Sequence, residues 1–172
     1  MRALVVYESM FGNTETIARA IAEGLGERYE VTLAEVGTMP EWLPVGLDLL
    51  VVGGPTHAFG LSRQSTRTDA AKQLGDRRPV SHGRGLREWL EQLLPGAGLA
   101  AAAFDTHIDK HFPGSASKAA ARRLRSRGYD VRMVESFHVS GTPGPLVDGE
   151  TDRARAWGAQ LAGRLAVADG GA

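Results

Sequence analysis

Residues 8–15 combine residue types that can bind an anion without a positive charge. They read Glu-Ser-Met-Phe-Gly-Asn-Thr-Glu, and an amphipathic pattern follows directly. A helix N-terminus offers free backbone N–H groups to an anion. Ser9, Asn13 and Thr14 can add side-chain donors, and Gly12 allows close approach of the backbone. The segment thus predicts a phosphate site; the alternative is that Ser9 or Asn13 only caps the helix.

Two further loops carry groups suited to a planar aromatic ligand. Gly-Gly-Pro-Thr-His-Ala-Phe-Gly occupies residues 53–60, and Asp-Thr-His-Ile-Asp-Lys-His-Phe-Pro-Gly occupies residues 105–114. Each follows a short apolar run that predicts a buried strand. In a doubly wound sheet, ligands bind outside the carboxyl ends of the strands near the topological switch point. We therefore expect all three loops to face one crevice.

The elements that must position these loops alternate along the chain. Apolar runs predict buried strands at residues 3–7, 49–52 and 99–104, an edge strand at 31–33 and a final strand at 131–139. Helical periodicity covers residues 14–28, 86–94, 115–127 and 150–165. This order predicts an α/β fold, a doubly wound sheet with right-handed crossovers and helices on both faces.

The segment from residue 61 to residue 85 does not fit this scheme. It is polar, contains several arginines, and has a helical pattern only at residues 70–74. Long connections in compact domains are usually functional or disordered. We expect either a surface loop over the strand ends or a lid.

Composition narrows the class of protein. The chain has 172 residues, no cysteine, and 20 basic against 20 acidic side chains. Its length predicts a single domain over residues 1–168 with a disordered tail at 169–172. Without cysteine, disulfides, thiolate catalysis and cysteine metal sites are excluded, and zero net charge disfavours nucleic-acid binding. The N-terminal residues resemble neither a signal peptide nor a membrane span, so we expect a cytoplasmic protein.

Residues 9–14, Ser-Met-Phe-Gly-Asn-Thr, are similar to the phosphate-binding motif of the flavodoxin family. That motif has a hydroxyl residue, any residue, Thr or Phe, Gly, Asn or Thr, and Thr. The resemblance extends through the Gly-Gly-Pro-Thr loop to the last helix. Because the final strand runs without a long interruption into residues 140–145, the chain resembles the short-chain branch. The resemblance implies a flavodoxin-like five-stranded parallel sheet in the order 2-1-3-4-5.

The resemblance also implies a non-covalently bound FMN. Its phosphate would lie on Ser9, Met10, Phe11, Gly12, Asn13 and Thr14. Its isoalloxazine ring would lie between two loops that supply Pro55, Thr56, His57, Ala58, Phe59, Gly60, Asp105, Thr106, His107, His111, Phe112 and Gly114. Backbone N–H groups at residues 105–107 would bind the pyrimidine oxygens.

The aromatic residues of these loops depart from the usual flavodoxin pattern. Flavodoxins often place Trp and Tyr on the two flavin faces, whereas this chain offers His57, Phe59, His111 and Phe112. The alternative for the two phenylalanines is simple packing. A cationic His57 or His111 near N1 would stabilise anionic reduced flavin. For His107 the alternative is a solvated loop residue, and Pro113 argues against a helix that would pair it with His111 as a metal ligand.

Two functions are compatible with such a site. The first is electron transfer between redox partner proteins. The alternative is an FMN-dependent oxidoreductase acting on a quinone or a porphyrinogen, with His57, His111 and the arginines of residues 63–84 contacting substrate or NAD(P)H. Zero net charge sets the chain apart from strongly acidic shuttle flavodoxins. A receiver module without flavin is disfavoured, because the acidic cluster and the aspartate that it needs are missing from the loops after the first and third strands.

Overall fold

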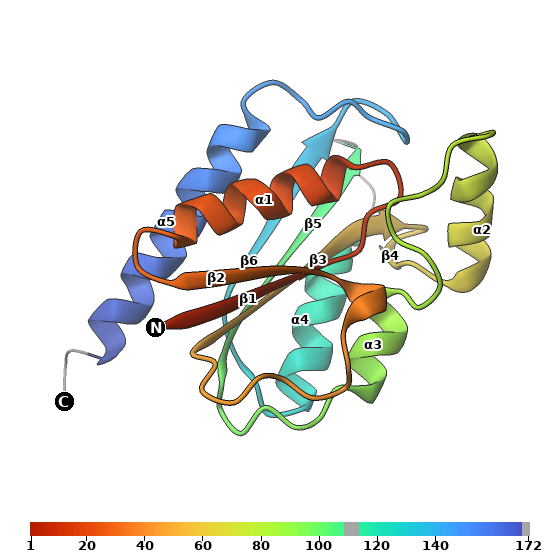
Figure 1. Ribbon diagram of the computed structural model, residues 1–172. Coiled ribbons are helices and arrows are strands. Elements are labelled where there is room, and N and C mark those ends of the chain that lie inside the picture. The colour runs from red at the N-terminus through yellow and green to blue at the C-terminus, as the bar shows by residue number, and fades with distance from the viewer. Residues whose placement is uncertain (109–113, 170–172) are drawn as a thin grey trace.

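The computed structural model describes residues 1–108 and 114–169 and has a parallel sheet at its centre (Figure 1). The strand order is β2 (Glu30–Glu35), β1 (Arg2–Tyr7), β3 (Leu49–His57), β5 (Ala100–Ile108) and β6 (Asp130–Val139). This confirms the predicted doubly wound sheet and its order. A sixth, short strand, β4 (Gly60–Leu61), pairs antiparallel with the end of β3. The five-stranded prediction missed β4 because it has only two residues.

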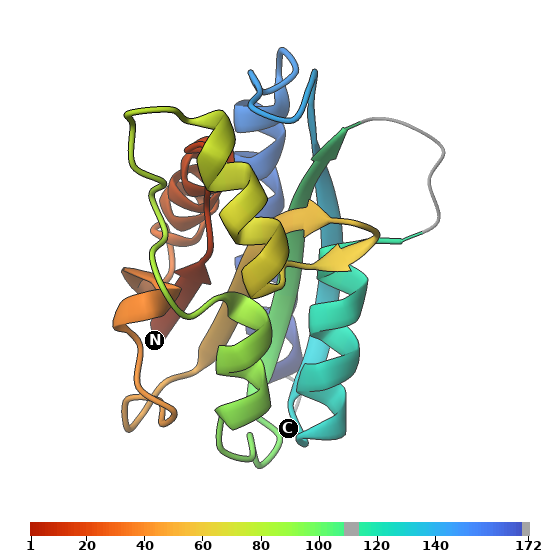
Figure 2. The same cartoon turned by 90° about the vertical axis from the view of Figure 1, so that its right-hand side faces the viewer.

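Helices cover both faces of the sheet. α1 (Asn13–Leu25) and α5 (Glu150–Asp169) pack on one face, and α3 (Leu86–Gln92) and α4 (Ala116–Ser126) pack on the other (Figures 1 and 2). β1 is apolar from Ala3 to Tyr7 because helices cover it on both faces. Val5 and Tyr7 belong to the core under α1 and α5, whereas Leu4 and Val6 belong to the core under α3 and α4.

The strands that lead into the predicted site are longer than their apolar runs. β3 continues from Val52 to His57, and β5 continues to Ile108. Gly53, Gly54 and Pro55 stay in register with Phe104, Asp105 and Thr106, so the two predicted loops begin as paired strands. Glycine and proline hid this extension from the sequence pattern.

The segment from residue 61 to residue 85 is neither a bare loop nor a free lid. It contains α2 (Gln64–Gln73) and a connection that leads into α3. α2 lies beyond the carboxyl ends of the strands, outside both helix layers (Figure 1). Its apolar periodicity is weak because only Arg67 and Ala70 are buried along its length, so a hydrophobic pattern could not reveal it.

Candidate functional site

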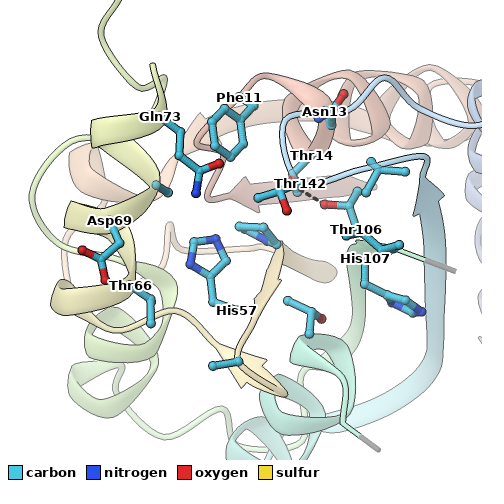
Figure 3. A pocket seen from close by; sticks show the side chains of 16 residues that line it. Phe11, Asn13, Thr14, His57, Thr66, Asp69, Gln73, Thr106, His107 and Thr142 are labelled. Atoms are coloured by element: carbon cyan, nitrogen blue, oxygen red, sulfur yellow. Dashed lines mark hydrogen bonds between the residues drawn. The ribbon is translucent and has the colours of Figure 1, made fainter. Parts of the chain in front are cut away.

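A cavity of about 290 Å³ lies at the carboxyl ends of β3 and β5 and beside the N-terminus of α1 (Figure 3). The three predicted loops do meet there. The predicted residues that line the cavity are Phe11, Asn13, Thr14, Pro55, Thr56, His57, Ala58, Thr106 and His107. Its volume is close to the lower end of the range of roughly 300–1,000 Å³ that ligand pockets occupy.

The other predicted residues lie behind or beside the cavity. Ser9, Met10 and Asp105 are buried, and Gly12 precedes the first residue of α1. Phe59, Gly60 and Gly114 lie at the β3–β4 turn and next to it, away from the cavity lining. His111 and Phe112 fall outside the described residues.

Seven lining residues were not predicted from the sequence. Four come from α2, and three follow or end strands: Thr66, Asp69, Ala70, Gln73, Ile108, Val139 and Thr142. The α2 residues carry no motif, and only the chain path brings them to the site. The Ser-Gly-Thr-Pro-Gly-Pro run at residues 140–145 was a usable signal for Thr142, since turn residues follow a strand there.

The N-terminus of α1 is open toward an anion. Gly12 has a φ of 94° and no side chain that could cap the helix. Ser9 Oγ accepts the Gly12 N–H at 3.1 Å, and Asn13 Nδ2 donates to the Pro143 carbonyl at 3.1 Å. Both side chains are therefore used outside the first turn, and the expectation that one of them caps α1 is not met. The N–H groups of that turn remain available to a phosphate.

Hydroxyl groups continue this polar strip into the cavity. Thr14 Oγ1 and Thr106 Oγ1 are 2.7 Å apart, and Thr142 lies beside them (Figure 3). Hydroxyls can donate or accept as a ligand requires. Among the described lining residues there is no lysine or arginine, so an anion here would be bound by neutral donors, as the sequence predicts.

The loop at residues 9–14 is fixed from outside by the end of the segment at residues 61–85. Ser9 N–H donates to Ser81 Oγ at 2.9 Å, and Ser81 N–H donates to the Ser9 carbonyl at 2.7 Å. Val80 N–H donates to the Met10 carbonyl at 3.2 Å. The connection after α2 is thus joined to the loop at residues 9–14 by backbone hydrogen bonds of the kind that join two strands.

A buried network fixes the other end of that segment. Ser62 Oγ donates to Glu8 Oε1 at 2.5 Å, and Leu86 N–H donates to Glu8 Oε2 at 2.7 Å. Arg67 donates to Ser62 Oγ at 2.9 Å and to both Glu88 oxygens at 3.1 and 3.2 Å. Burial raises the pKa of Glu8, and the hydrogen bonds from Ser62 and Leu86 oppose that rise. Held at both ends, α2 is a fixed wall of the cavity.

The Asp105 side chain does not line the cavity and joins the two loops from behind, so the contact expected between the cofactor and the backbone N–H of this residue stays a prediction. Its Oδ2 accepts from Ser115 Oγ at 2.6 Å, Ser117 N–H at 2.9 Å and Thr56 Oγ1 at 3.1 Å. Burial alone would raise the pKa of Asp105, but hydrogen bonds from His107, Ser115 and the Ser117 N–H lower it to about 2. The carboxylate is therefore ionised at neutral and at mildly acidic pH.

This pKa predicts an acid-sensitive loss of stability. The folded pKa of about 2 lies below the ordinary value of 3.8, so the contribution of Asp105 is full above about pH 5 and is lost as the pH falls toward 2. We expect the free energy of unfolding to fall by roughly 2 kcal/mol more in the parent than in Asp105→Asn between these limits. Urea unfolding at pH 5, 4, 3 and 2 measures this difference, and parallel curves would contradict it.

The two described histidines of the site are unlike the expected cationic or solvated ones. His57 is half-buried, and its ring points into the cavity toward Gln73 (Figure 3). Burial and then the Arg67 charge lower the pKa of His57, so the ring is neutral at neutral pH. His107 Nδ1 lies 3.1 Å from Asp105 Oδ1, and its ring stands edge-on to His138. A neutral His57 does not supply the positive charge expected near the flavin.

The turn between β3 and β4 is strained. Ala58 and Phe59 have φ values of 43° and 72°, as in the two-residue turn that is normally built from Asn and Gly. The Phe59 side chain is 59% exposed and is not part of the cavity lining.

We expect Phe59→Gly to raise the free energy of unfolding by about 1 kcal/mol, because glycine adopts this conformation without a steric penalty. Chemical denaturation compares it with Phe59→Ala, which keeps the strain. Equal stability of the two variants would show that the strain is absent.

The arginines of residues 63–84 do not contact the cavity. Arg67 forms an ion pair with Glu88. Arg84 forms an ion pair with Glu41 at 2.9 Å and donates a hydrogen bond to the Met39 carbonyl. None of the arginines in this segment lines the cavity. The cavity lining therefore gives no support to the expectation that they contact substrate or NAD(P)H, which stays a prediction.

Fold and site together define a class: a doubly wound α/β protein with an uncharged polar loop at residues 9–14 and a cavity at the switch point of its sheet. The flavodoxin family model matches residues 5–114. This match covers more than half of the chain, so the chain belongs to the flavodoxin family. Comparison with curated proteins gives no significant match.

Solved structures with the same fold are distant in sequence. A flavodoxin from the domain Archaea is 18% identical, with a TM-score of 0.64 over 96% of this chain and 99% of the other. Flavodoxin 2 from Bacillus cereus is 21% identical, with a TM-score of 0.66 over 95% and 99%. A short-chain flavodoxin associated with a bacterial microcompartment is 15% identical, with a TM-score of 0.63 over 96% and 99%. Within the described residues, no helix has the length and hydropathy needed to cross a membrane.

Flavodoxins bind FMN, and FMN is the cofactor that family membership gives to this chain. The hydrogen-bond donors that line the cavity suit FMN. A helix N-terminus without a capping side chain matches a phosphate, and threonine hydroxyls match the polar chain between phosphate and ring.

Proposed function

We propose that this flavodoxin holds FMN with its phosphate at residues 9–14 and its ring beside Pro55–Ala58 and Thr106–Ile108, and passes electrons to an acceptor. The observation that supports this placement most strongly is the uncapped first turn of α1, which opens into the cavity. The first-turn N–H groups and the Thr14 hydroxyl would hold the phosphate. Bound FMN supplies one- and two-electron redox chemistry.

The chain's own residues orient the cofactor and limit its contact with water. Thr56 is fixed by Asp105 and by the Ala116 N–H at 2.9 Å, so the loop under the ring has a defined position. Pro55 and Ala58 contribute small apolar surfaces to the lining. The Thr14–Thr106 pair connects the phosphate end of the cavity to the ring end.

A second candidate function is direct reduction of a small molecule, and α2 is the observation that favours it. This helix adds a fixed wall to one side of the cavity, where a flavin edge would otherwise be open to a protein partner. A walled site suits a small acceptor such as a quinone better than a docking protein. A bulky, polyanionic porphyrinogen is less compatible, because the described lining has no arginine or lysine to receive it.

The absorption spectrum of the purified protein tests the first proposal. We expect the bands of oxidised flavin, and chromatography of the released chromophore should identify FMN rather than FAD or riboflavin. If the protein is colourless and does not take up added FMN, the proposed function is wrong. Reduction of a quinone by photoreduced protein, with no added reductase, then separates the second candidate from a protein-to-protein shuttle.

A further inference from the structure

The surface of α4 carries positive charge that the cavity does not use. Residues 114–129 contain five cations and no carboxylate. Three of the cations, Lys118, Arg122 and Arg125, are exposed, and they are four and three residues apart. This spacing places them in one row along the helix, the α4 stripe. Within the described residues, no carboxylate forms an ion pair with any member of the stripe.

Arginines from neighbouring elements widen the stripe into a basic face. Arg63 precedes the first residue of α2, Arg87 lies in α3 and Arg123 lies in α4. Burial lowers the pKa of Arg87, and the charges of Arg123 and Arg63 lower it further, so the three cations lie close enough to repel one another. α3 brings two carboxylates to this region, and each of them already pairs with an arginine. The basic face therefore has positive charge left over for a partner.

This basic face begins at the end of the cavity where the flavin ring is expected. The Ala116 N–H, in the first turn of α4, donates to Thr56 Oγ1 at 2.9 Å, and Thr56 lines the cavity. Lys118 is exposed two residues further along the same turn. α4, drawn in cyan, lies beside α3 and the β3–β4 turn (Figure 2). A protein that docks on this face would therefore lie near the expected ring, on a side of the cavity that α2 does not wall off.

The charge of the whole chain and the composition of α4 narrow the kind of partner. The net charge is zero, so the cations of this face are balanced by carboxylates elsewhere on the molecule. Such an uneven distribution orients an approaching charged protein even without a net attraction. Among the large apolar side chains that are exposed in the described residues, none belongs to α4. The helix thus lacks the anchors of a membrane-surface helix, and zero net charge disfavours a nucleic acid.

We propose that the basic face formed by the α4 stripe, Arg63, Arg87 and Arg123 is the docking surface for an acidic redox protein. This inference rests on the proposed function, since reduced FMN is the electron donor. Each transfer moves one electron from reduced FMN to a one-electron centre of the partner. Two transfers return FMN to its oxidised form, and its two protons pass to water.

Two forms of one acceptor isolate the effect of charge. Native cytochrome c is basic, and succinylation converts its lysines into carboxylates around the same haem. Stopped-flow mixing with photoreduced, FMN-loaded protein measures reduction of the haem iron from the ferric to the ferrous state. At an ionic strength of about 10 mM we expect the succinylated form to react at least tenfold faster than the native form. The difference should disappear near 1 M salt, where the Debye length is about 3 Å.

A pair of double variants locates the docking surface. Lys118→Gln with Arg122→Gln removes two charges from the α4 stripe. Arg28→Gln with Arg164→Gln is the matched control, because these exposed arginines follow α1 and lie on α5, which pack on the other face of the sheet. At low ionic strength, the stripe variant should reduce the succinylated form about fivefold more slowly than the parent, and the control should change this rate less than twofold.

NMR gives a readout that does not depend on electron transfer. Oxidised succinylated cytochrome c, added to isotope-labelled protein, should shift the amide signals of residues 114–129 in the parent and in the control. The same addition should shift them much less in the stripe variant, since the charges that attract the acidic protein are missing.

The outcomes separate this inference from the proposed function. If the stripe variant and the control reduce the succinylated form at equal rates, the docking surface is wrong and the FMN site stands. If the stripe variant loses binding to duplex DNA or to phosphatidylglycerol vesicles while its reduction rates stay at parent values, the face has another anionic partner and the inference is also wrong. If the protein holds no FMN, no haem is reduced by any variant and the proposed function is overturned. The NMR shifts then still decide whether an acidic protein docks on α4.

Discussion

Asn13→Asp should abolish retention of FMN while leaving the fold intact. The substitution puts a carboxylate of nearly the same shape at the first residue of α1, beside the expected phosphate. At a separation of about 4 Å and an effective dielectric constant near 20, two unit charges repel by roughly 4 kcal/mol, which corresponds to a loss of affinity of about a thousandfold. A carboxylate in the first turn of a helix is favourable for the helix itself, and this offsets the lost hydrogen bond to the Pro143 carbonyl, so the free energy of unfolding should change by no more than about 1 kcal/mol.

Fluorescence titration of the apoprotein with FMN measures this loss, and circular dichroism checks the fold. Thr16→Asp is the matched control, because Thr16 is exposed in the same turn of α1 and does not line the cavity. It adds the same charge and should lower FMN affinity by much less. If Asn13→Asp binds FMN as well as Thr16→Asp, the phosphate lies elsewhere.

Arg67→Met should destabilise the protein and release α2. The substitution keeps the aliphatic part of the side chain but removes the hydrogen bonds to Ser62 and to both oxygens of Glu88. Breaking a buried ion pair from one side typically costs about 3–5 kcal/mol, and the partial exposure of Glu88 places the expected loss near 3 kcal/mol. The pKa of His57 should rise at the same time, since the Arg67 charge contributes to lowering it.

Urea unfolding gives the stability change, and NMR titration of the His57 ring gives the second readout. Arg63→Met is a suitable control, because Arg63 is an exposed arginine at the start of the same helix. Arg67→Met combined with Glu88→Gln should recover part of the lost stability, since the unpaired carboxylate is then removed. A loss below about 1 kcal/mol in Arg67→Met would show that α2 is held by packing alone.

Most of the fold could be predicted from the sequence because its strands are buried on both faces. Residues 3–7 and 49–52 are apolar without a break. Such short runs, separated by helical segments, fit strands that helices cover on both faces of the sheet. The position of the loop at residues 9–14, between the first strand and α1, could be predicted as well, since Gly12 and its polar neighbours directly follow that strand; its binding of phosphate stays a prediction. The motif at residues 9–14 could be recognised because it is made of consecutive residues, whatever the rest of the chain contacts.

The parts that could not be predicted depend on contacts between distant residues. α2 owes its position to Arg67, Ser62 and Glu8, and buried polar contacts leave no periodic trace in a sequence. The Asp105 side chain lies behind the cavity because three donors bind it, two at the start of α4 and one at the end of β3, and no local sequence pattern reveals these contacts. The neutral state of His57 likewise follows from burial that only the packed chain defines.

The segment that carries α2 begins and ends at nearly the same point of the molecule. Arg87, in the first turn of α3, donates to the Ser62 carbonyl at 2.9 Å and to the Leu61 carbonyl at 2.5 Å. Residues 63–85 therefore form a module inserted between two neighbouring points of an unchanged sheet, and closing that gap with a short linker costs little chain entropy. Exchanging the α2 part of this module, with Arg67, Val80 and Ser81 kept, would change the acceptor that the protein meets while the backbone hydrogen bonds to the loop at residues 9–14 stay in place.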